Sequence, residues 1–356
     1  MPSVLLTGAN GFLATHVLKC LVEDAFDVVG TVRSEAKADD VFDAHPEFKS
    51  RLRLAVVSDM SAPGAYDKVF EGRHFDYVIH AAAPVPDGDG TDFDRDFLGP
   101  GAQGNLELLH AAQKYCKALK HFTYTGSMVA VHDVTKPLDG HVLKSADWNP
   151  VSPEVARQLQ HPGASYMISK TLAEKALWDF VKKEKPSFGV SVLSVPLIIG
   201  PPLQHLHQNG AGKSRFNMSA DLFYQTFLQP VSGTVGGPSR PLYIGYIDVR
   251  DVAALHVQSI IKGGSENRRL LVASPEPFLA KTVLGILADK FPQLVNRLPS
   301  VRAAAIVANG EQDEHHPLKV DDSEAKQLFG GRIYRPLEQT VVDTAKRLLE
   351  LERSST

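Results

Sequence analysis

Short apolar runs alternate with longer amphipathic stretches along the first 200 residues, and this alternation limits the possible folds most strongly. The runs are rich in β-branched residues, as in parallel strands that are buried on both faces. Helical patterns separate them, so strand–helix–strand units repeat and predict an α/β fold with a doubly wound parallel sheet. We expect strands at 4–7, 28–32, 52–57, 77–80, 121–125 and 190–195, separated by helices at 12–24, 35–44, 65–71, 92–119 and 165–185.

The amino-acid composition changes after Gly200, where Pro, Gln, His, Asn and Gly interrupt the periodic hydrophobic pattern. A chain of 356 residues is long enough for two lobes. We predict a nucleotide-binding domain from residues 1–199 and 241–262, and a smaller, discontinuous substrate-binding lobe from 200–240 and 263–356. Within that lobe we expect a strand at 269–273 and helices at 277–291, 323–329 and 337–351.

Charge and cysteine content exclude several classes of protein. Lys and Arg total 38 against 41 Asp and Glu, so neither nucleic acid nor an anionic membrane is an expected partner. Two cysteines cannot build a disulfide framework, which favours a reducing compartment. No secretory signal or run of about 20 apolar residues is found. We therefore expect a cytoplasmic protein.

The first strand runs into Gly8-Ala-Asn-Gly11 and then directly into a helix. Gly8 and Gly11 permit a tight turn, and the free amides of the helix N-terminus favour a bound pyrophosphate. Ala14 stands where dinucleotide-binding turns usually carry a third glycine, and is small enough for close helix–strand packing. The pattern predicts a Rossmann-type dinucleotide site.

The end of the second strand decides which dinucleotide is expected. Arg33 stands where an acid would bond the ribose 2′-hydroxyl of NAD(H). A guanidinium, helped by Ser34 and Lys37, suits a 2′-phosphate instead, so NADP(H) is favoured. Asp59 and Met60 follow the third strand, where the adenine would lie.

Tyr166 and Lys170 are four residues apart and share one face of a predicted helix. A free phenol titrates near pH 10, and a neighbouring ammonium favours its phenolate, so Tyr166 is a candidate general acid. Ser127, at the end of the fifth strand, is a candidate hydrogen-bond donor to the same carbonyl oxygen. No metal site is predicted, because His205/His207 and His315/His316 lack suitably spaced partner ligands.

With these residues in place, the sequence resembles the extended short-chain dehydrogenases/reductases nearly end to end. Within them it is most similar to the yeast-type NADPH-dependent methylglyoxal and aldehyde reductases and the fungal carbonyl reductases. More distant similarity extends to dihydroflavonol and cinnamoyl-CoA reductases. The motifs that carry it are Thr7-Gly-Ala-Asn-Gly-Phe12, Gly30-Thr-Val-Arg-Ser34, Asp76-Tyr-Val-Ile-His-Ala-Ala-Ala-Pro84, Ser127, Tyr166-x-x-x-Lys170, Trp148-Asn-Pro150, Tyr246-Ile-Asp-Val-Arg-Asp-Val-Ala253 and Asp321-Asp-Ser-Glu-Ala-Lys-Gln-Leu-Phe-Gly330.

The resemblance implies a catalytic triad of Ser127, Tyr166 and Lys170, with Lys170 also binding the nicotinamide ribose. It further implies that Ile198 lines the nicotinamide and that Ser219 meets a phosphate. The adenosine half would be held by Gly8, Asn10, Gly11, Phe12, Leu13, Arg33, Lys37, Asp59 and Met60.

Three departures from the family pattern bear on the site. Gln103 stands before Gly104 where relatives usually have Asn, which questions any role of that Asn. Pro196 is shifted by one position relative to the usual proline. Val85, Met128 and Leu197 replace residues that are often aromatic, and predict a wider, aliphatic substrate pocket.

These features favour an NADPH-dependent reductase that transfers a hydride to the carbonyl of an aldehyde or ketone, as a monomer or homodimer. An NAD(P)-dependent epimerase or hydroxysteroid-type dehydrogenase shares the triad, but such enzymes commonly prefer NAD. A non-catalytic regulator that senses the dinucleotide is the alternative of another class.

Overall fold

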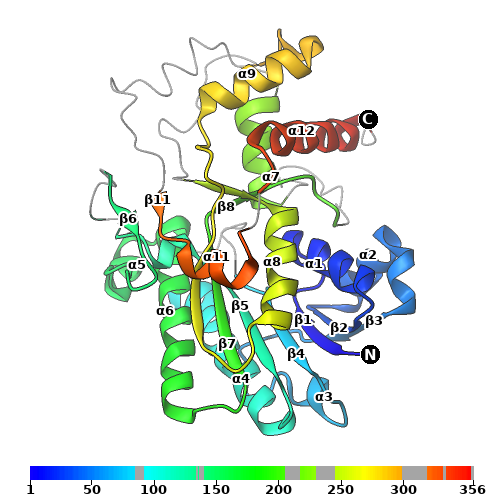
Figure 1. The fold of residues 1–356 in the computed structure, drawn as a ribbon, viewed down its shortest axis with the longest axis vertical. Helices are drawn as coiled ribbons and strands as arrows, with labels where there is room; N and C mark the ends of the chain where they lie inside the picture. Colours follow the sequence, from blue (N-terminus) through cyan, green and yellow to red (C-terminus); the bar gives the residue numbers. More distant parts are fainter. Residues whose placement is uncertain are drawn as a thin grey trace.

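The computed structural model describes residues 1–84, 92–133, 135, 140–204, 217–229, 245–298, 319–331 and 334–353. Its main body is a seven-stranded parallel sheet in the order β10-β7-β5-β4-β1-β2-β3 (Figure 1). This confirms the predicted doubly wound α/β fold, with one strand more than the six assigned to the sheet. The strands are β1 (Ser3–Thr7), β2 (Asp27–Val32), β3 (Leu52–Val56), β4 (Tyr77–His80), β5 (His121–Ser127), β7 (Gly189–Val195) and β10 (Arg268–Leu271).

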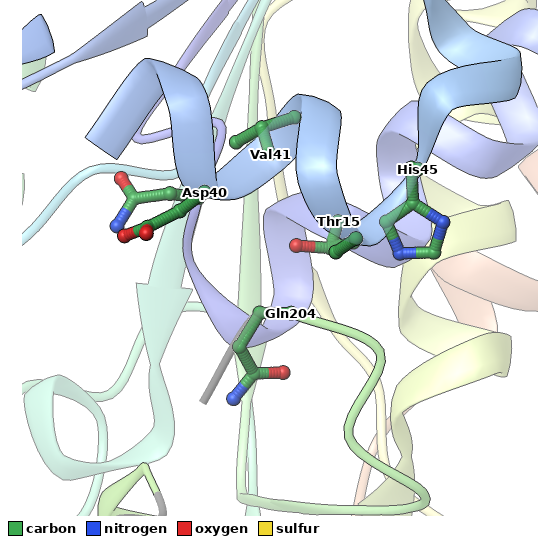
Figure 2. A pocket seen from close by; sticks show the side chains of 7 residues that line it. Thr15, Asp40, Val41, His45 and Gln204 are labelled. Atoms are coloured by element: carbon green, nitrogen blue, oxygen red, sulfur yellow. The ribbon is translucent and has the colours of Figure 1, made fainter. Parts of the chain in front are cut away.

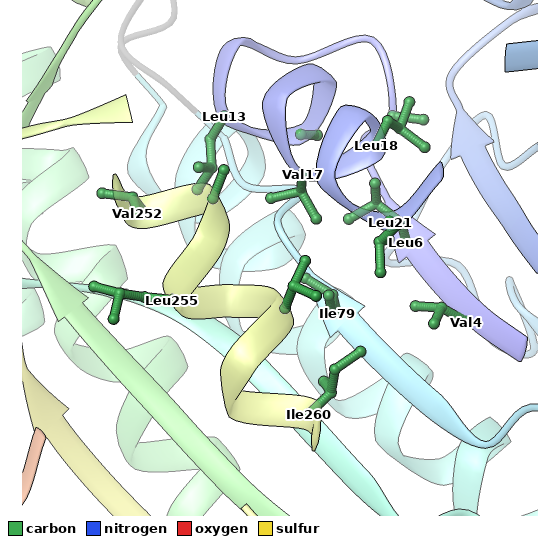
Figure 3. Packing of buried hydrophobic residues seen from close by; sticks show 14 of the residues in the cluster. Val4, Leu6, Leu13, Val17, Leu18, Leu21, Ile79, Val252, Leu255 and Ile260 are labelled. Carbon is green, nitrogen blue, oxygen red and sulfur yellow. The ribbon is translucent and has the colours of Figure 1, made fainter. Parts of the chain in front are cut away.

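Helices cover both faces of this sheet, and β1 shows how one strand serves both. Val4 and Leu6 point into one hydrophobic cluster, whereas Leu5 points into the other. The first face carries α1 (Phe12–Glu23), α2 (Glu35–Ala44), α8 (Val249–Lys262) and α11 (Ser323–Phe329). The opposite face carries α3 (Asp67–Phe70), α4 (Gly104–Tyr115) and α6 (Pro162–Glu184). Figure 3 shows the apolar side chains of α1 and α8 meeting over β1 and β4.

The long helix expected at 92–119 is two elements. A π-helical segment, η2 (Phe93–Gln103), contains Pro100 and precedes α4. Proline lacks the amide hydrogen that a regular helix requires, which accounts for the change of winding. Both η2 and α4 pack against α6.

The segment in which the smaller lobe is predicted follows β8 (Leu197–Ile199), which Pro196 separates from β7. There β8 leaves the main sheet and pairs with β9 (Tyr246–Asp248). The helices of this lobe gather beyond β8, at the top of Figure 1. They are α7 (Met218–Phe223), η4 (Tyr224–Leu228), α9 (Ala280–Lys290), η5 (Pro292–Leu294) and α12 (Leu337–Arg353).

The boundary expected at residue 263 is wrong for two elements. β10 pairs in parallel with β7 and forms the edge of the main sheet. Ala325 and Phe329 of α11 are buried in the same cluster as α1 and α8. The chain therefore stays with the main sheet after α8, because the buried run of β10 covers the edge of β7, and sequence order alone did not reveal this crossover.

Five further elements of the described residues lie near the sheet or connect its parts. They are η1 (Pro46–Ser50), η3 (Met128–Ala130), α5 (Pro153–Leu159) and a short parallel pair, β6 (Val142–Leu143) with β11 (Lys319–Val320). Among the helices of the described ranges, none combines the length and apolar character that crossing a bilayer requires.

Candidate active site

The predicted site residues follow the carboxyl ends of the parallel strands. The chain runs outward through β1, β2 and β3, and then crosses to β4 on the other side of β1. Such a switch point opens a crevice at the strand ends, where doubly wound proteins bind ligands. Gly8, Arg33, Asp59 and Ser127 all lie at this edge.

The turn between β1 and α1 has the geometry of a phosphate cradle. Gly8 has a φ of +70°, and a Cβ there would stand 3.1 Å from the Ala82 backbone. The Gly11 amide donates to the Gly8 carbonyl oxygen at 2.8 Å, which closes the turn. Gly11 caps α1 without a side chain, so the first amides of the helix are left for a ligand. These features fit a pyrophosphate.

The residues at the adenosine end differ in how they are engaged. Arg33 is exposed just beyond β2, on the approach to α2. Lys37 forms an ion pair with Asp40, with Nζ and Oδ2 3.0 Å apart. Asp59 accepts hydrogen bonds from the Ser61 hydroxyl at 2.6 Å and amide at 2.9 Å, which lower the pKa of its carboxyl.

A small cavity lies beside this end of the site, between α1 and α2. Figure 2 shows Thr15, Asp40, His45 and Gln204 gathered around it. Asn10 of the glycine turn also lines the cavity, whereas none of the three predicted catalytic residues does.

Tyr166 and Lys170 lie one turn apart on α6, at different depths. Tyr166 is half-buried, whereas only 5% of Lys170 is exposed. The Lys170 ammonium donates to the Thr125 carbonyl oxygen at 2.9 Å and to the Tyr124 hydroxyl at 3.2 Å. Burial lowers the pKa of Lys170 from 10.5 to about 8, against the opposing charge of Glu174. The helix therefore carries a buried cation one turn from a half-buried tyrosine.

Ser127 ends β5 and is half-buried. Its hydroxyl oxygen accepts a hydrogen bond from the Val129 amide at 3.4 Å, at the start of η3. Both β5 and η3 pack against α6. The structure thus brings the three predicted catalytic residues onto two neighbouring elements at the carboxyl edge of the sheet.

Comparison with known proteins agrees with this architecture. Residues 4–268 match the model of the NAD dependent epimerase/dehydratase family. The chain belongs to this family. The finding confirms the resemblance to the extended short-chain dehydrogenases/reductases.

Two kinds of relative match the chain nearly end to end. An NADPH-dependent methylglyoxal reductase of Saccharomyces cerevisiae is 32% identical, over 98% of this chain and 99% of its own. A ketoreductase of Aspergillus niger is 28% identical over 98% and 97%. The solved structure of the yeast methylglyoxal/isovaleraldehyde reductase complexed with NADPH has a TM-score of 0.82 at 30% identity, covering 98% of this chain and 99% of that one.

A buried hydrogen-bond cluster around Thr7 joins the end of β1 to the end of β4. The Thr7 hydroxyl oxygen accepts from the amides of Ala81 and Ala82 at 3.1 Å, so its own hydrogen is donated to Nδ1 of His80 at 2.6 Å. Burial lowers the pKa of His80 to about 3, so the imidazole is neutral. Both residues stand in motifs that resemble the family pattern, but no local feature of the sequence predicts a role for either.

Asn105, rather than Gln103, contacts α6, the helix that carries Tyr166 and Lys170. Gln103 is exposed, and its Nε2 donates to Glu107 at 2.8 Å. Asn105 is fully buried on α4, and its Nδ2 donates to the Ala173 carbonyl oxygen of α6 at 3.1 Å. A polar residue at a buried helix position was the signal that sequence reasoning missed.

The remaining predicted residues are distributed over several elements. Ile198 is half-buried in β8, and Ser219 lies in the first turn of α7, which Asn217 caps. Met128 and Leu197 are buried in separate hydrophobic clusters. Their role in a substrate pocket stays a prediction. Val85 and the two histidine pairs lie outside the described residues.

Proposed function

We propose that this protein is an NADPH-dependent reductase that converts the carbonyl group of an aldehyde or ketone to an alcohol. The observation that carries the proposal is the buried ammonium of Lys170 one helical turn from the half-buried phenol of Tyr166. A short turn that starts at Ser127 packs against the same helix. In this proposal Tyr166 is the proton donor, Lys170 the cation that supports it and Ser127 the second hydroxyl.

The substrate carbonyl would lie between the Ser127 hydroxyl and the Tyr166 phenol. Bound NADPH supplies the hydride for the carbonyl carbon. Ser127 donates a hydrogen bond to the carbonyl oxygen, and Tyr166 transfers its phenolic proton to that oxygen. The Lys170 ammonium stabilises the phenolate that Tyr166 becomes, because its contacts with Thr125 and Tyr124 hold it in place.

The cofactor would bind across the carboxyl edge of the sheet. The amides at the start of α1 would hold its pyrophosphate, and exposed Arg33 with Lys37 would bind the 2′-phosphate that distinguishes NADPH from NADH. The S. cerevisiae relative is itself named NADPH-dependent. Further contacts are assigned to Asn10, Phe12, Leu13, Asp59, Met60, Lys170, Ile198 and Ser219.

The substrate class rests on the relatives, which are named methylglyoxal, aldehyde and ketone reductases. Val85, Met128 and Leu197 would give the pocket an aliphatic lining that admits bulky carbonyl compounds. The first measurement is oxidation of NADPH, with NADH in parallel, in the presence of methylglyoxal, isovaleraldehyde, an aryl ketone and a β-keto ester. Oxidation of NADPH by at least one of them is the expected result.

Replacing Tyr166 with Phe tests the mechanism directly. The variant keeps the ring but loses the proton donor, so kcat should fall by roughly 100-fold to 10,000-fold while NADPH still binds. Fluorescence titration measures binding and the absorbance of NADPH measures turnover. Near-normal turnover would rule out the assigned role of Tyr166, and binding by the wild type without any turnover would favour the regulatory alternative.

We place this reductase in the cytoplasm as a monomer or homodimer. Both cysteines are free thiols, and Cys116 is buried, which suits a reducing compartment. Sedimentation of the purified chain measures the oligomeric state.

A further inference from the structure

A buried ion pair joins α6 to the edge of the sheet behind the candidate catalytic residues. Glu174 lies one turn beyond Lys170 on α6 and is fully buried, and Arg269 on β10 is 8% exposed. Nε of Arg269 lies 2.6 Å from Oε1 of Glu174, and Nη2 lies 3.4 Å from Oε2. The Trp178 indole donates to the same carboxylate at 3.2 Å. This two-pronged contact is specific to the planar guanidinium.

The remaining hydrogens of Arg269 all go to backbone carbonyl oxygens. Nη2 donates to Ala130 at 3.4 Å, and Nη1 donates to Ser145 at 2.8 Å and to Asp147. Together with the two contacts to Glu174, these use all five N–H groups that an arginine possesses. A lysine at this position has three donors and lacks the fork geometry.

One of these carbonyl oxygens belongs to the turn that follows Ser127. Ala130 closes η3, and its oxygen also accepts from the Asn149 amide at 2.9 Å. The Asn149 side chain donates to the Val129 carbonyl oxygen at 2.9 Å. The Trp148 ring stacks on the guanidinium of Arg269, whose Cζ atom lies 3.7 Å from the centre of the ring. The Trp-Asn-Pro motif thus holds the same turn as Arg269.

We infer that Glu174 and Arg269 are positioning residues, which set the distance between the Ser127 turn and the helix that carries Tyr166 and Lys170. The inference rests on the proposed reductase function. Neither residue touches the reacting atoms, so each acts through the element that it holds. The Glu174 carboxylate also stands one turn from the Lys170 ammonium and favours its charged form.

The test compares Arg269→Lys and Glu174→Gln with the wild-type holoenzyme. Arg269→Lys keeps the charge but releases the carbonyl oxygens, so kcat should fall at least tenfold while the NADPH dissociation constant changes less than twofold. Arg250→Lys is the matched control, because Arg250 forms a similar fork with buried Asp248 and also binds Asp343. It should change kcat less than twofold.

The pH profile separates positioning from general loss of stability. Glu174→Gln removes the carboxylate beside Lys170, so the alkaline limb of kcat/KM should move to lower pH. Arg269→Lys retains that carboxylate and should move the limb less. A buried charge that loses its partner destabilises a protein, so the double variant Glu174→Met/Arg269→Met provides a neutral pair if a single variant does not fold. It should fold and show the same loss of kcat.

The outcomes are distinct. Wild-type protein that oxidises no NADPH with any carbonyl compound overturns the proposed function. Active wild type with kcat retained in folded Arg269→Lys or in the double variant overturns the positioning role. An equal loss of kcat in Arg250→Lys also overturns the positioning role. The loss would then follow from breaking any two-pronged arginine–carboxylate pair, wherever it lies in the protein.

Discussion

The turn after β1 and the turn after β5 lie at the same edge of one sheet but are built by different means. The first is made of backbone: Gly8 and Gly11 shape it, and the apolar contacts of α1 with α8 lie behind it. The second is held by side chains, with Asn149 and Arg269 bonded to the carbonyl oxygens of η3. A pyrophosphate requires free amides and close approach, whereas a catalytic hydroxyl requires a fixed position relative to another helix.

The largest effect is expected behind the first turn. Leu18 is fully buried in the cluster of α1 and α8, so Leu18→Ala should lower the free energy of unfolding by about 2–5 kcal/mol. Catalysis by the folded fraction should change little, because this cluster holds no catalytic side chain. Urea unfolding and kcat measure the two effects. Leu159→Ala, at a leucine that is 60% exposed, is the control. A tenfold loss of kcat in Leu18→Ala would contradict the view that the packing behind the first turn supports stability rather than catalysis.

A smaller effect is expected at Gly8. Gly8→Ala places a Cβ against Ala82 at a φ of +70°, whereas Gly72→Ala has nearly the same φ of +69° with no atom within 4 Å. Gly72→Ala should cost about 1–2 kcal/mol of stability from backbone strain. Gly8→Ala should lower the free energy of unfolding by more than this, because its Cβ also meets Ala82. The same Cβ should weaken NADPH binding roughly tenfold, which corresponds to about 1.4 kcal/mol. Thermal unfolding with and without NADPH measures both. Equal losses in the two variants would contradict a cradle at Gly8.

The smallest effect, counted per pH unit, concerns Lys170 of α6, whose ammonium donates to the Thr125 carbonyl oxygen of β5 just before the second turn. Because the pKa of Lys170 is lowered to about 8, the reductase should lose kcat/KM as the pH rises above about 8 and the ammonium disappears. Between pH 8 and 10.5 the folded state binds fewer protons at this group than the unfolded chain, so its contribution to the free energy of unfolding rises with pH. The slope is about 1.4 kcal/mol per pH unit at most.

Lys170→Met supplies the reference for that titration. The stability difference between wild type and Lys170→Met should shift in favour of the wild type as the pH increases from 8 to 10. A constant difference would show that Lys170 does not titrate in this range. Unfolding by urea at each pH, in the absence of cofactor, gives the values.

Local patterns in the sequence were enough to predict most of the strands and helices of the main sheet and the candidate residues at the strand ends. Alternating apolar runs and helical patterns predicted the strands of the main sheet, because each is decided by near neighbours. The same holds for Gly8 to Gly11, for Arg33 and for the spacing of Tyr166 and Lys170, since a turn or one helical face brings these residues together.

Contacts between residues that are distant in sequence could not be predicted in this way. Arg269 is 95 positions from Glu174 and 139 from Ala130, and it meets both because β10 returns to the sheet edge beside β7. The same pairing places β10 in the main sheet, although the sequence analysis assigned residues 263–356 to the smaller lobe. The contact of Asn105 with Ala173 was likewise not predictable from local sequence, because it depends on how α4 packs on α6. Such contacts follow from the order of strands and the packing of helices, which no local periodicity encodes.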